Sequence, residues 1–396
     1  AGSSACLPAS VRGVTARYAH AMTTDRFAER RSAFLSRLGR TVAVVPAARE
    51  QIRNDDVPHP FRQDSDFHFL TGFTEPDAVA VFDAASDTPY TLFVRPRDPE
   101  AEAWTGLRAG TEGALERFGA DAAYPLDELD DRLRRQLTGR DSVGYVLGGP
   151  IDAAVLGAVR AVGGYADRSG VGVPTQVIDI RAIVHELRLV KSADEIEALR
   201  EACRISAIAH NEAMRFAAPG RSERQVAAAL EYVFGVLDAE RVGYSSIVAG
   251  GDNACILHYV ENDQLLADGD LLLVDAAAEY RHLTSDITRT FPVNGRFSRP
   301  QREVYELVLR AQQDVISMCR PGLPFTDMHT RAVEVLSAGL VELGLLPGTA
   351  EEVVAKGWYR RFFFHGTGHW LGIDVHDAGT SRVEGAGRLL APGMAF

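Results

Sequence analysis

The sequence predicts an α/β and α+β protein, with an N-terminal α/β domain on a mixed sheet and a second domain with an internal two-fold duplication. Three observations predict this architecture. The chain has 396 residues, which is enough for two domains with separate cores. Short strand patterns alternate with helical patterns as far as Glu186. Beyond Lys191 the order helix, helix, histidine-bearing strand begins twice.

Composition narrows the class of protein. Hydrophobic residues make up 46% of the chain and charged residues 24%, as in ordinary globular proteins. The formal net charge of −12 argues against a nucleic-acid partner, because phosphate binding needs clustered Lys and Arg. No apolar run approaches the roughly 20 residues of a membrane span. We therefore expect no nucleic-acid partner and no membrane association.

The cysteines indicate the compartment. They are far apart, with no CxxC pair, at Cys6, Cys203, Cys255 and Cys319. This spacing fits free thiols in a reducing compartment better than a disulfide framework or a zinc finger. We expect a cytoplasmic protein.

The two ends of the chain look unusual. The first residues include Arg12 and Arg17 and no acid before Asp25, but they lack the apolar core of a signal peptide. A transit peptide remains an alternative, and Met22 is a plausible natural start. We expect residues 1–22 to be a disordered or non-native extension. The chain stops in APGMAF, an apolar strand-like segment, so we also expect a C-terminal truncation.

The first domain is expected at residues 23–187. Thr24 caps a helical pattern that ends at Gly39. A polar loop at 55–65 separates the first strand from the next ones. We expect strands at 41–46, 67–73, 78–82, 90–95 and 143–147, helices at 111–118, 126–137 and 151–162, and a connector at 177–189.

The second domain is expected at residues 188–396. Ser192 and Glu195 form an S-x-x-E capping box before a long amphipathic pattern, and Ser222 with Gln225 repeats the box. We expect helices from these two boxes, a strand at 254–259, a third helix from Ser298, a fourth at 326–343, and a strand region at 362–375.

Between the helix pairs lies LLLVDAAAEYRHLTSDITRTF, from Leu271 to Phe291. It reads as two apolar strands joined by a polar turn near 279–281. If the strands pair antiparallel, Asp275 and Asp286 fall side by side on one face. Two buried carboxylates that close repel, so one is protonated or a cation lies between them. Alone, the pattern fits equally well a hairpin with two unrelated surface aspartates.

The segment FFFHGTGHWLGIDVHD places His365, His369 and His376 within twelve residues. Histidine is the commonest transition-metal ligand and a proton shuttle near neutral pH. The segment lacks the HExxH pattern of a zincin helix, and its glycines have the wrong spacing for a dinucleotide loop. A single buried histidine is more often a core residue, but three in one segment weaken that reading. His258, in CILHYVEN, could be strand filler or a site residue.

Other enzyme motifs do not occur. The sequence has no GxxxxGK[ST] loop, no GxSxG elbow and no cysteine with a nucleophile signature. Paired carboxylates with nearby histidines are the ligands of a two-metal hydrolytic centre. Metal-assisted hydrolysis is therefore the enzyme class that the residues favour most.

Four segments carry a family resemblance. NACILHYVEN, LLLVDAAAEYRHLTSDITRTFPVNGRF and FFFHGTGHWLGIDVHD closely resemble the aminopeptidase P branch of the pita-bread metallopeptidases. DVPHPFRQDSDFHFLTGF resembles the N-terminal domain of the same branch. The likeness runs from about Thr24 to the end of the chain. It implies that the second domain has the pita-bread fold.

The resemblance also implies a ligand set of two Asp, one His and two Glu around two divalent metal ions, usually manganese. The matching positions are Asp275, Asp286, which bridges both ions, and His369. The two glutamates are expected beyond Phe396. His258, His365 and His376 match the family's histidines that position the substrate and move protons.

The implied function is that of an Xaa-Pro aminopeptidase, which uses a hydroxide bridging two metal ions to release the residue before proline. Its partner is a peptide with proline at the second position, and we expect a homo-oligomer, a dimer or a tetramer. A prolidase acting on Xaa-Pro dipeptides and an inactive peptide- or protein-binding relative are the alternatives. A creatinase-like amidinohydrolase is disfavoured, because that branch shares the fold without the metal ligands.

Overall fold

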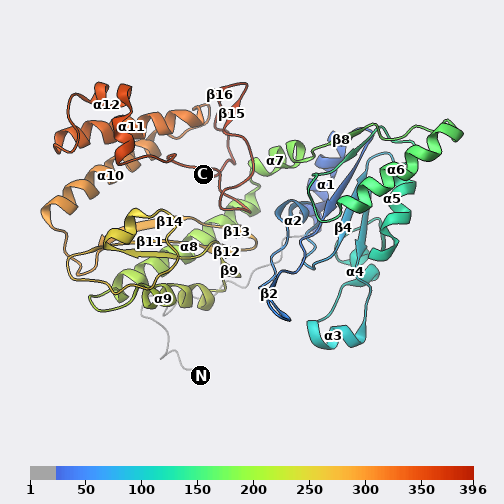
Figure 1. The fold of residues 1–396 in the computed structure, drawn as a ribbon, viewed down its shortest axis with the longest axis horizontal. Coiled ribbons are helices and arrows are strands. Elements are labelled where there is room, and N and C mark those ends of the chain that lie inside the picture. The colour runs from blue at the N-terminus through green and yellow to red at the C-terminus, as the bar shows by residue number, and fades with distance from the viewer. Residues whose placement is uncertain (1–23) are drawn as a thin grey trace. The chain divides into compact units, whose positions relative to one another are not determined.

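The computed structural model describes residues 24–396, so the extension expected at 1–22 lies outside the described residues. The described chain forms two compact units, one up to Arg188 and the other Leu189–Phe396 (Figure 1). Within the described residues, no helix has both the length and the apolar character needed to cross a membrane.

A six-stranded mixed sheet forms the centre of the first unit, which confirms the predicted architecture. Its order is β6-β5-β4-β1-β7-β8. The pairs β1–β4 and β4–β5 are antiparallel, whereas β5–β6, β1–β7 and β7–β8 are parallel. The strands are β1 (Thr41–Pro46), β4 (Val79–Asp83), β5 (Tyr90–Val94), β6 (Ala122–Pro125), β7 (Ser142–Gly144) and β8 (Gln176–Ile178), and a separate pair is β2 (Ile52–Asn54) with β3 (Val57–Pro58).

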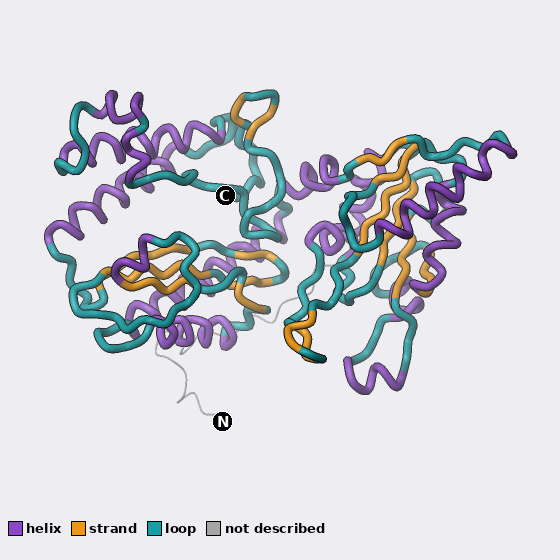
Figure 2. Tube along the Cα trace, viewed as in Figure 1, coloured by secondary structure: helices purple, strands orange, loops and turns teal. Residues whose placement is uncertain are grey.

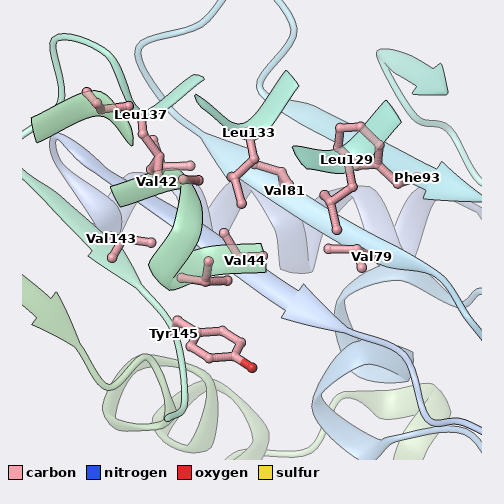
Figure 3. Close-up of a cluster of buried hydrophobic side chains, with 13 residues drawn as sticks. Val42, Val44, Val79, Val81, Phe93, Leu129, Leu133, Leu137, Val143 and Tyr145 are labelled. Carbon is pink, nitrogen blue, oxygen red and sulfur yellow. The ribbon is translucent and has the colours of Figure 1, made fainter. Parts of the chain in front are cut away.

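Helices supply the rest of the core of this unit. Leu129, Leu133 and Leu137 of α5 pack on valines of β1 and β4 (Figure 3). Phe34 of α1 packs edge-on against Phe82 of β4. Every residue of β4 and β5 is buried, as expected for central strands covered on both faces. The helices are α1 (Thr24–Leu38), α2 (Ser65–Thr71), α3 (Pro99–Thr105), α4 (Gly110–Glu116), α5 (Leu129–Leu137), α6 (Asp152–Ser169) and α7 (Arg181–Leu189).

One expectation in this unit is wrong. Residues 67–71 of the segment expected as a strand at 67–73 belong to α2 instead. Asp64 caps that helix by accepting a hydrogen bond from the backbone N of Phe67 at 2.8 Å, and left-handed Gly72 ends it. A short apolar run fits a buried strand and a buried helix equally well. Here the capping side chain of Asp64 favours the helix. The connector expected at 177–189 contains part of β8 and the whole of α7, and the division between the two units falls within it.

In the second unit the predicted helices form, and three of them begin with complete capping boxes. The pairs are Ser192–Glu195 at α8, Ser222–Gln225 at α9, and Ser298–Gln301 at α10. The helix pair α8 and α9 is followed along the chain by the pair α10 and α11, as the duplication predicts. The helices are α8 (Ala193–Phe216), α9 (Glu223–Val236), α10 (Arg299–Met318), α11 (Phe325–Glu342) and α12 (Ala350–Lys356).

The aspartate hairpin forms the centre of the sheets in the second unit. Its register is continuous from the pair Leu271–Pro292 to the pair Tyr280–Leu283. Arg281 and His282 make the two-residue turn and both have positive φ, so the turn lies at the far edge of the predicted position. The sheets are β10-β11-β14 and β13-β12-β9, with β9 (Arg241–Val242), β10 (Ile247–Gly250), β11 (Leu271–Ala276), β12 (Ala278–Tyr280), β13 (Leu283–Thr284) and β14 (Ile287–Pro292).

The strand expected at 254–259 is wrong, because a buried carboxylate organises this segment instead. Oε1 of Glu223 accepts hydrogen bonds from the backbone N of Gly250 and the side chain of Asn253. Oε2 accepts from the hydroxyl of Tyr259 and the backbone N of Gln264. The chain therefore wraps around Glu223 as a 3-10 turn, η3 (Gly251–Cys255), followed by a loop.

The strand region expected at 362–375 is also wrong. The chain between α12 and β15 (Arg382–Val383) forms a short 3-10 helix, η4 (Trp358–Arg361), and otherwise runs as loops (Figure 2). β15 pairs with β16 (Ala386–Gly387) in a two-stranded sheet. Hydrogen bonds within this segment replace a strand ladder, for example from Asp377 N to Trp370 O at 2.8 Å. We call residues 362–377 the histidine segment.

Candidate metal centre

The two predicted aspartates lie on the same face of the hairpin. Asp275 on β11 is opposite Thr288, and Asp286 precedes β14 two residues before Thr288. Because side chains two residues apart share a face, the two carboxylates are diagonal neighbours, as predicted. Both residues are partly buried.

Tyr244 joins the two carboxylates. Its hydroxyl hydrogen-bonds Asp275 and lies 2.8 Å from Oδ1 of Asp286. A phenol has only one hydrogen, so it can donate to one carboxylate at a time. The other carboxylate therefore receives no hydrogen bond from Tyr244. The two neighbouring carboxylates need a proton or a cation between them.

A bulge in the neighbouring strand brings Tyr244 to this position. Val242 of β9 pairs with Ala278, and Ile247 of β10 pairs with Asp275. Residues 243–246 therefore lie opposite only residues 276–277, so the strand bulges there. Bulges of this kind re-aim side chains and occur often beside active sites. Glycine is required at position 243, next to Tyr244, because a Cβ there would clash with Oγ1 of Thr284.

The pKa values of the two aspartates shift in opposite directions. Burial raises the pKa of Asp275, and the charge of Asp286 adds to the rise, against a hydrogen bond from Tyr244. Burial would also raise the pKa of Asp286, but hydrogen bonds from His369 and Tyr244 outweigh it and lower that pKa. The two carboxylates are thus electrostatically distinct, and Asp286 is the more firmly ionised.

His369 approaches the same carboxylate from the histidine segment. Its Nε2 lies 3.2 Å from Oδ2 of Asp286, and its Nδ1 lies 3.1 Å from the carbonyl oxygen of Trp370. The hydrogen bond to Asp286 raises the pKa of His369, and burial offsets only part of the rise. An Nδ1–H bonded to a carbonyl leaves Nε2 as the nitrogen for a metal ion.

His376 belongs to the same group of side chains, whereas His365 and His258 do not. The rings of His369 and His376 meet edge-on, with centroids 4.3 Å apart. His365 turns its Nδ1 toward the carbonyl of Gly366 at 2.7 Å, and its ring lies against Phe363. His258 is exposed after η3. Within residues 24–396, neither of these two histidines hydrogen-bonds to the aspartates or to His369.

Tyr244 is the site residue that sequence reasoning missed. Its sequence context, RVGYSSI, carries no metal or catalytic motif. The signal that could have found it is the run of Gly243 before Tyr244 and two serines after it, which interrupts a strand pattern beside the aspartate hairpin. A bulge at that break is a reason to ask which side chain it re-aims.

A second group of possible ligands lies at the other end of the hairpin. One ligand atom from each of Glu240, Glu279 and His282 lies within 4.8 Å of the others. The guanidinium of Arg241 contacts the carboxylates of both Glu240 and Glu279. A positive charge is therefore already in place, and this group has less need of an ion than the aspartate pair.

The side chains around Asp286 fit a divalent metal. Asp286 is the central carboxylate, linked to Asp275 through Tyr244 and approached directly by His369. Carboxylate oxygens with one imidazole suit hard or borderline divalent ions. Asp275, Asp286 and His369 are the residues that would hold such ions.

Two family descriptions match this chain. Residues 197–396 match metallopeptidase family M24, and residues 27–145 match the aminopeptidase P N-terminal domain. The chain belongs to metallopeptidase family M24. The first match includes the whole aspartate hairpin and the whole histidine segment.

Individual relatives agree with membership of family M24. The Xaa-Pro aminopeptidase of Escherichia coli is 40% identical over 94% of this chain and 85% of that protein. The solved structure of the aminopeptidase PepP of Pseudomonas aeruginosa has a TM-score of 0.92 and 45% identity, over 94% of this chain and 85% of that one.

The description of a further solved structure names a metal. Zn-substituted aminopeptidase P of Escherichia coli in complex with product has a TM-score of 0.91 and 39% identity, over 95% of this chain and 86% of that one. These likenesses confirm the expected pita-bread fold and the use of a divalent metal by this family.

Proposed function

We propose that this M24 protein is an Xaa-Pro aminopeptidase, which releases an N-terminal residue that precedes proline. The observation that carries the proposal is that Asp286 is contacted by His369 and joined to Asp275 through Tyr244, on a chain whose relatives are Xaa-Pro aminopeptidases. Residues 23–187 would form the aminopeptidase P-like domain and residues 188–396 the catalytic domain. The two compact units and the two family matches support this division.

In this proposal Asp275, Asp286 and His369 hold two divalent ions, with Asp286 shared between them. Asp286 is the carboxylate that both other ligands approach, directly or through Tyr244, and this supports its bridging role. Manganese is the proposed metal, because hard oxygen ligands with one imidazole suit Mn²⁺. The bound ions would polarise the scissile carbonyl and lower the pKa of the attacking water.

The protein's own groups perform the remaining work. Tyr244 orients the two carboxylates, and the Trp370 carbonyl fixes the ring of His369. His376 is exposed beside His369, where it can hydrogen-bond a substrate carbonyl and the oxyanion that develops from it. His258 and His365 are proposed for the same task, and their exposure supports contact with a bound peptide.

The chemistry of proline explains why this site can accept a substrate that general peptidases handle poorly. The amide before proline has no N–H, and the ring fixes φ of the proline residue. A general peptidase that binds this N–H loses one hydrogen bond to such a substrate. A site that binds carbonyl oxygens through histidines does not depend on that N–H, so a peptide with proline at the second position remains a substrate.

The decisive experiment compares three peptides with the full-length protein and Mn²⁺: an Xaa-Pro-Yaa tripeptide, an Xaa-Pro dipeptide and an Xaa-Ala-Yaa tripeptide. Release of Xaa from the first alone, or far faster from the first, is the expected result. Preference for the dipeptide would instead identify a prolidase. Binding of the tripeptide without cleavage would identify an inactive peptide-binding relative.

Two further parts of the proposal concern the cell. A cytoplasmic location is supported by free thiols at Cys203, Cys255 and Cys319 among the described residues. A homo-oligomer, dimer or tetramer, is implied by the family resemblance. Fluorescence microscopy of a tagged protein tests the location. Light scattering of the purified protein tests the assembly, and a monomeric mass would contradict it.

A further inference from the structure

One ion pair in the second unit is almost completely removed from water. Nζ of Lys191 lies 2.8 Å from Oδ2 of Asp377, and each side chain is only 1% exposed. Nζ also donates to the carbonyl oxygen of Leu189 at 3.3 Å. Taking two charges out of water is expensive, and apolar residues would often stabilise a core equally well. Such a pair therefore calls for an explanation other than stability.

Asp377 closes a loop of the histidine segment. Its backbone N donates to the carbonyl of Trp370 at 2.8 Å, and its Oδ1 accepts from the backbone N of Asp374 at 3.3 Å. The residues just before the two ends of this loop are His369 and His376. The closure therefore determines how near their rings approach, and their centroids are 4.3 Å apart.

Besides a backbone hydrogen bond from Leu371 N to Ala395 O at 3.0 Å, the closed loop is held at two points that bear on the site. Lys191 lies just before α8 and binds Oδ2 of Asp377, so the loop is attached to the beginning of that helix. The carbonyl of Gly372 accepts a hydrogen bond from the backbone N of Thr284 at 3.0 Å. Thr284 lies on the aspartate hairpin, so the loop is also attached two residues before Asp286, a proposed ligand.

The ion pair leaves no room for a side chain at Gly372. A Cβ at that position would lie 2.2 Å from Oδ2 of Asp377 and 2.9 Å from Cε of Lys191. The backbone of the loop thus passes directly against the buried charges. Displacing either charged group would shift the backbone that lies between His369 and His376.

We infer that Lys191 and Asp377 are positioning residues, whose buried ion pair holds His369 and His376 side by side and sets them against Asp286. The catalytic role of this arrangement rests on the proposed function, in which His369 is a metal ligand and His376 contacts the substrate. The juxtaposition itself is a property of the metal-free protein. It can therefore be measured without metal and without activity.

The test uses Asp377→Asn and Lys191→Met in the full-length protein. The asparagine side chain would retain an oxygen that accepts from the N of Asp374, so the first variant removes the charge with the least disturbance of shape. The matched control is Arg140→Met, which breaks the partly buried Arg140–Asp83 pair of the first unit, where the contact is also 2.8 Å.

The first readout is structural and needs no metal. With labelled histidines, the metal-free wild-type protein should show a nuclear Overhauser contact between the rings of His369 and His376. Asp377→Asn should lose this contact, and the control should keep it. A folded Asp377→Asn variant that keeps the contact would overturn the inference, whatever the protein's activity. If Lys191→Met fails to fold, the Asp377→Asn result still decides.

The second readout is functional. Groups that support metal ligands typically contribute 10–100-fold to metal affinity. Asp377→Asn should weaken Mn²⁺ binding in calorimetry by about tenfold or more, and lower kcat more than it raises KM. The control should match the wild type in both. Unchanged Mn²⁺ affinity and kcat in the variant would exclude the positioning role, and failure of the wild type itself to cleave Xaa-Pro-Yaa would reject only the proposed function.

Discussion

Asp275 and Asp286 are diagonal neighbours on one face of a hairpin whose register is continuous from its open end to its turn. This relationship brings two carboxylates close together although ten residues separate them in the chain. Mutual repulsion makes the pair unfavourable in the absence of a cation. The face that carries the two aspartates is therefore where we expect the effects of mutation to be largest.

Asp286→Ala should lose more metal and more activity than any single histidine substitution. Asp286 is the carboxylate that both Tyr244 and His369 contact, so its removal affects the whole group. Metal content by mass spectrometry and turnover of Xaa-Pro-Yaa in the full-length variant provide the measurement. Full occupancy with normal hydrolysis would rule out the assignment of Asp286 as a bridging ligand.

The histidines should separate into two classes. His369→Ala should lose metal, because its Nε2 is the nitrogen directed at Asp286. His365→Ala and His376→Ala should keep the metal and lower turnover by about 10²-fold or more, as for loss of a group that stabilises the transition state. Equal metal loss in all three variants would show that the division between ligand and substrate contact is wrong.

Tyr244→Phe should weaken metal binding by about 10–100-fold, because the variant removes the hydroxyl that orients both carboxylates. Tyr305→Phe on α10, whose ring packs against Phe297, removes a hydroxyl elsewhere in the same unit and serves as the control. Calorimetric titration with Mn²⁺ measures both variants. If the two variants bind Mn²⁺ equally well, Tyr244 does not orient the ligands.

A pH-dependent effect is expected in the first unit. Burial would raise the pKa of Asp66, but hydrogen bonds and charge from His185 and Arg188 outweigh it and lower that pKa. A lowered pKa means that the folded state favours the carboxylate. This stabilisation is present above the unfolded value of about 3.9 and is lost as the pH falls through the lowered folded value.

Asp66→Asn should therefore lower the free energy of unfolding at pH 7 by about 1–3 kcal/mol, since it leaves the buried Arg188 with one partner fewer. The difference from the wild type should shrink as the pH falls below about 4. Asp141→Asn is the control, because its pair with Arg40 is largely exposed and contributes little. Denaturant unfolding at several pH values tests this, and a loss independent of pH would contradict it.

Local sequence patterns were enough to predict where three helices begin and which face of the hairpin carries the two aspartates. The capping boxes at Ser192, Ser222 and Ser298 lie where helices begin, and the alternation around Asp275 and Asp286 placed both on one face. These features depend on residues within a few positions of each other. A single sequence is sufficient to find them.

The sequence did not predict features that depend on distant partners. The segment after Gly250 looked like a strand, but its form is set by the carboxylate of Glu223, 27 residues earlier in the chain. The histidine segment is held by Lys191, 186 residues before Asp377. Tyr244 reaches the aspartates only because of a bulge. None of these arrangements has a local periodicity that could reveal it.

The two-residue turn at Arg281 and His282 has a consequence for how this protein can vary. Because side chains alternate along a strand, one residue inserted into or deleted from the hairpin would turn Asp286 to the face opposite Asp275. Surface loops that carry or support no residue of the centre tolerate changes in length better. The number of residues between Asp275 and Asp286 cannot change in this way. Natural or designed variants that keep the centre should therefore keep this spacing.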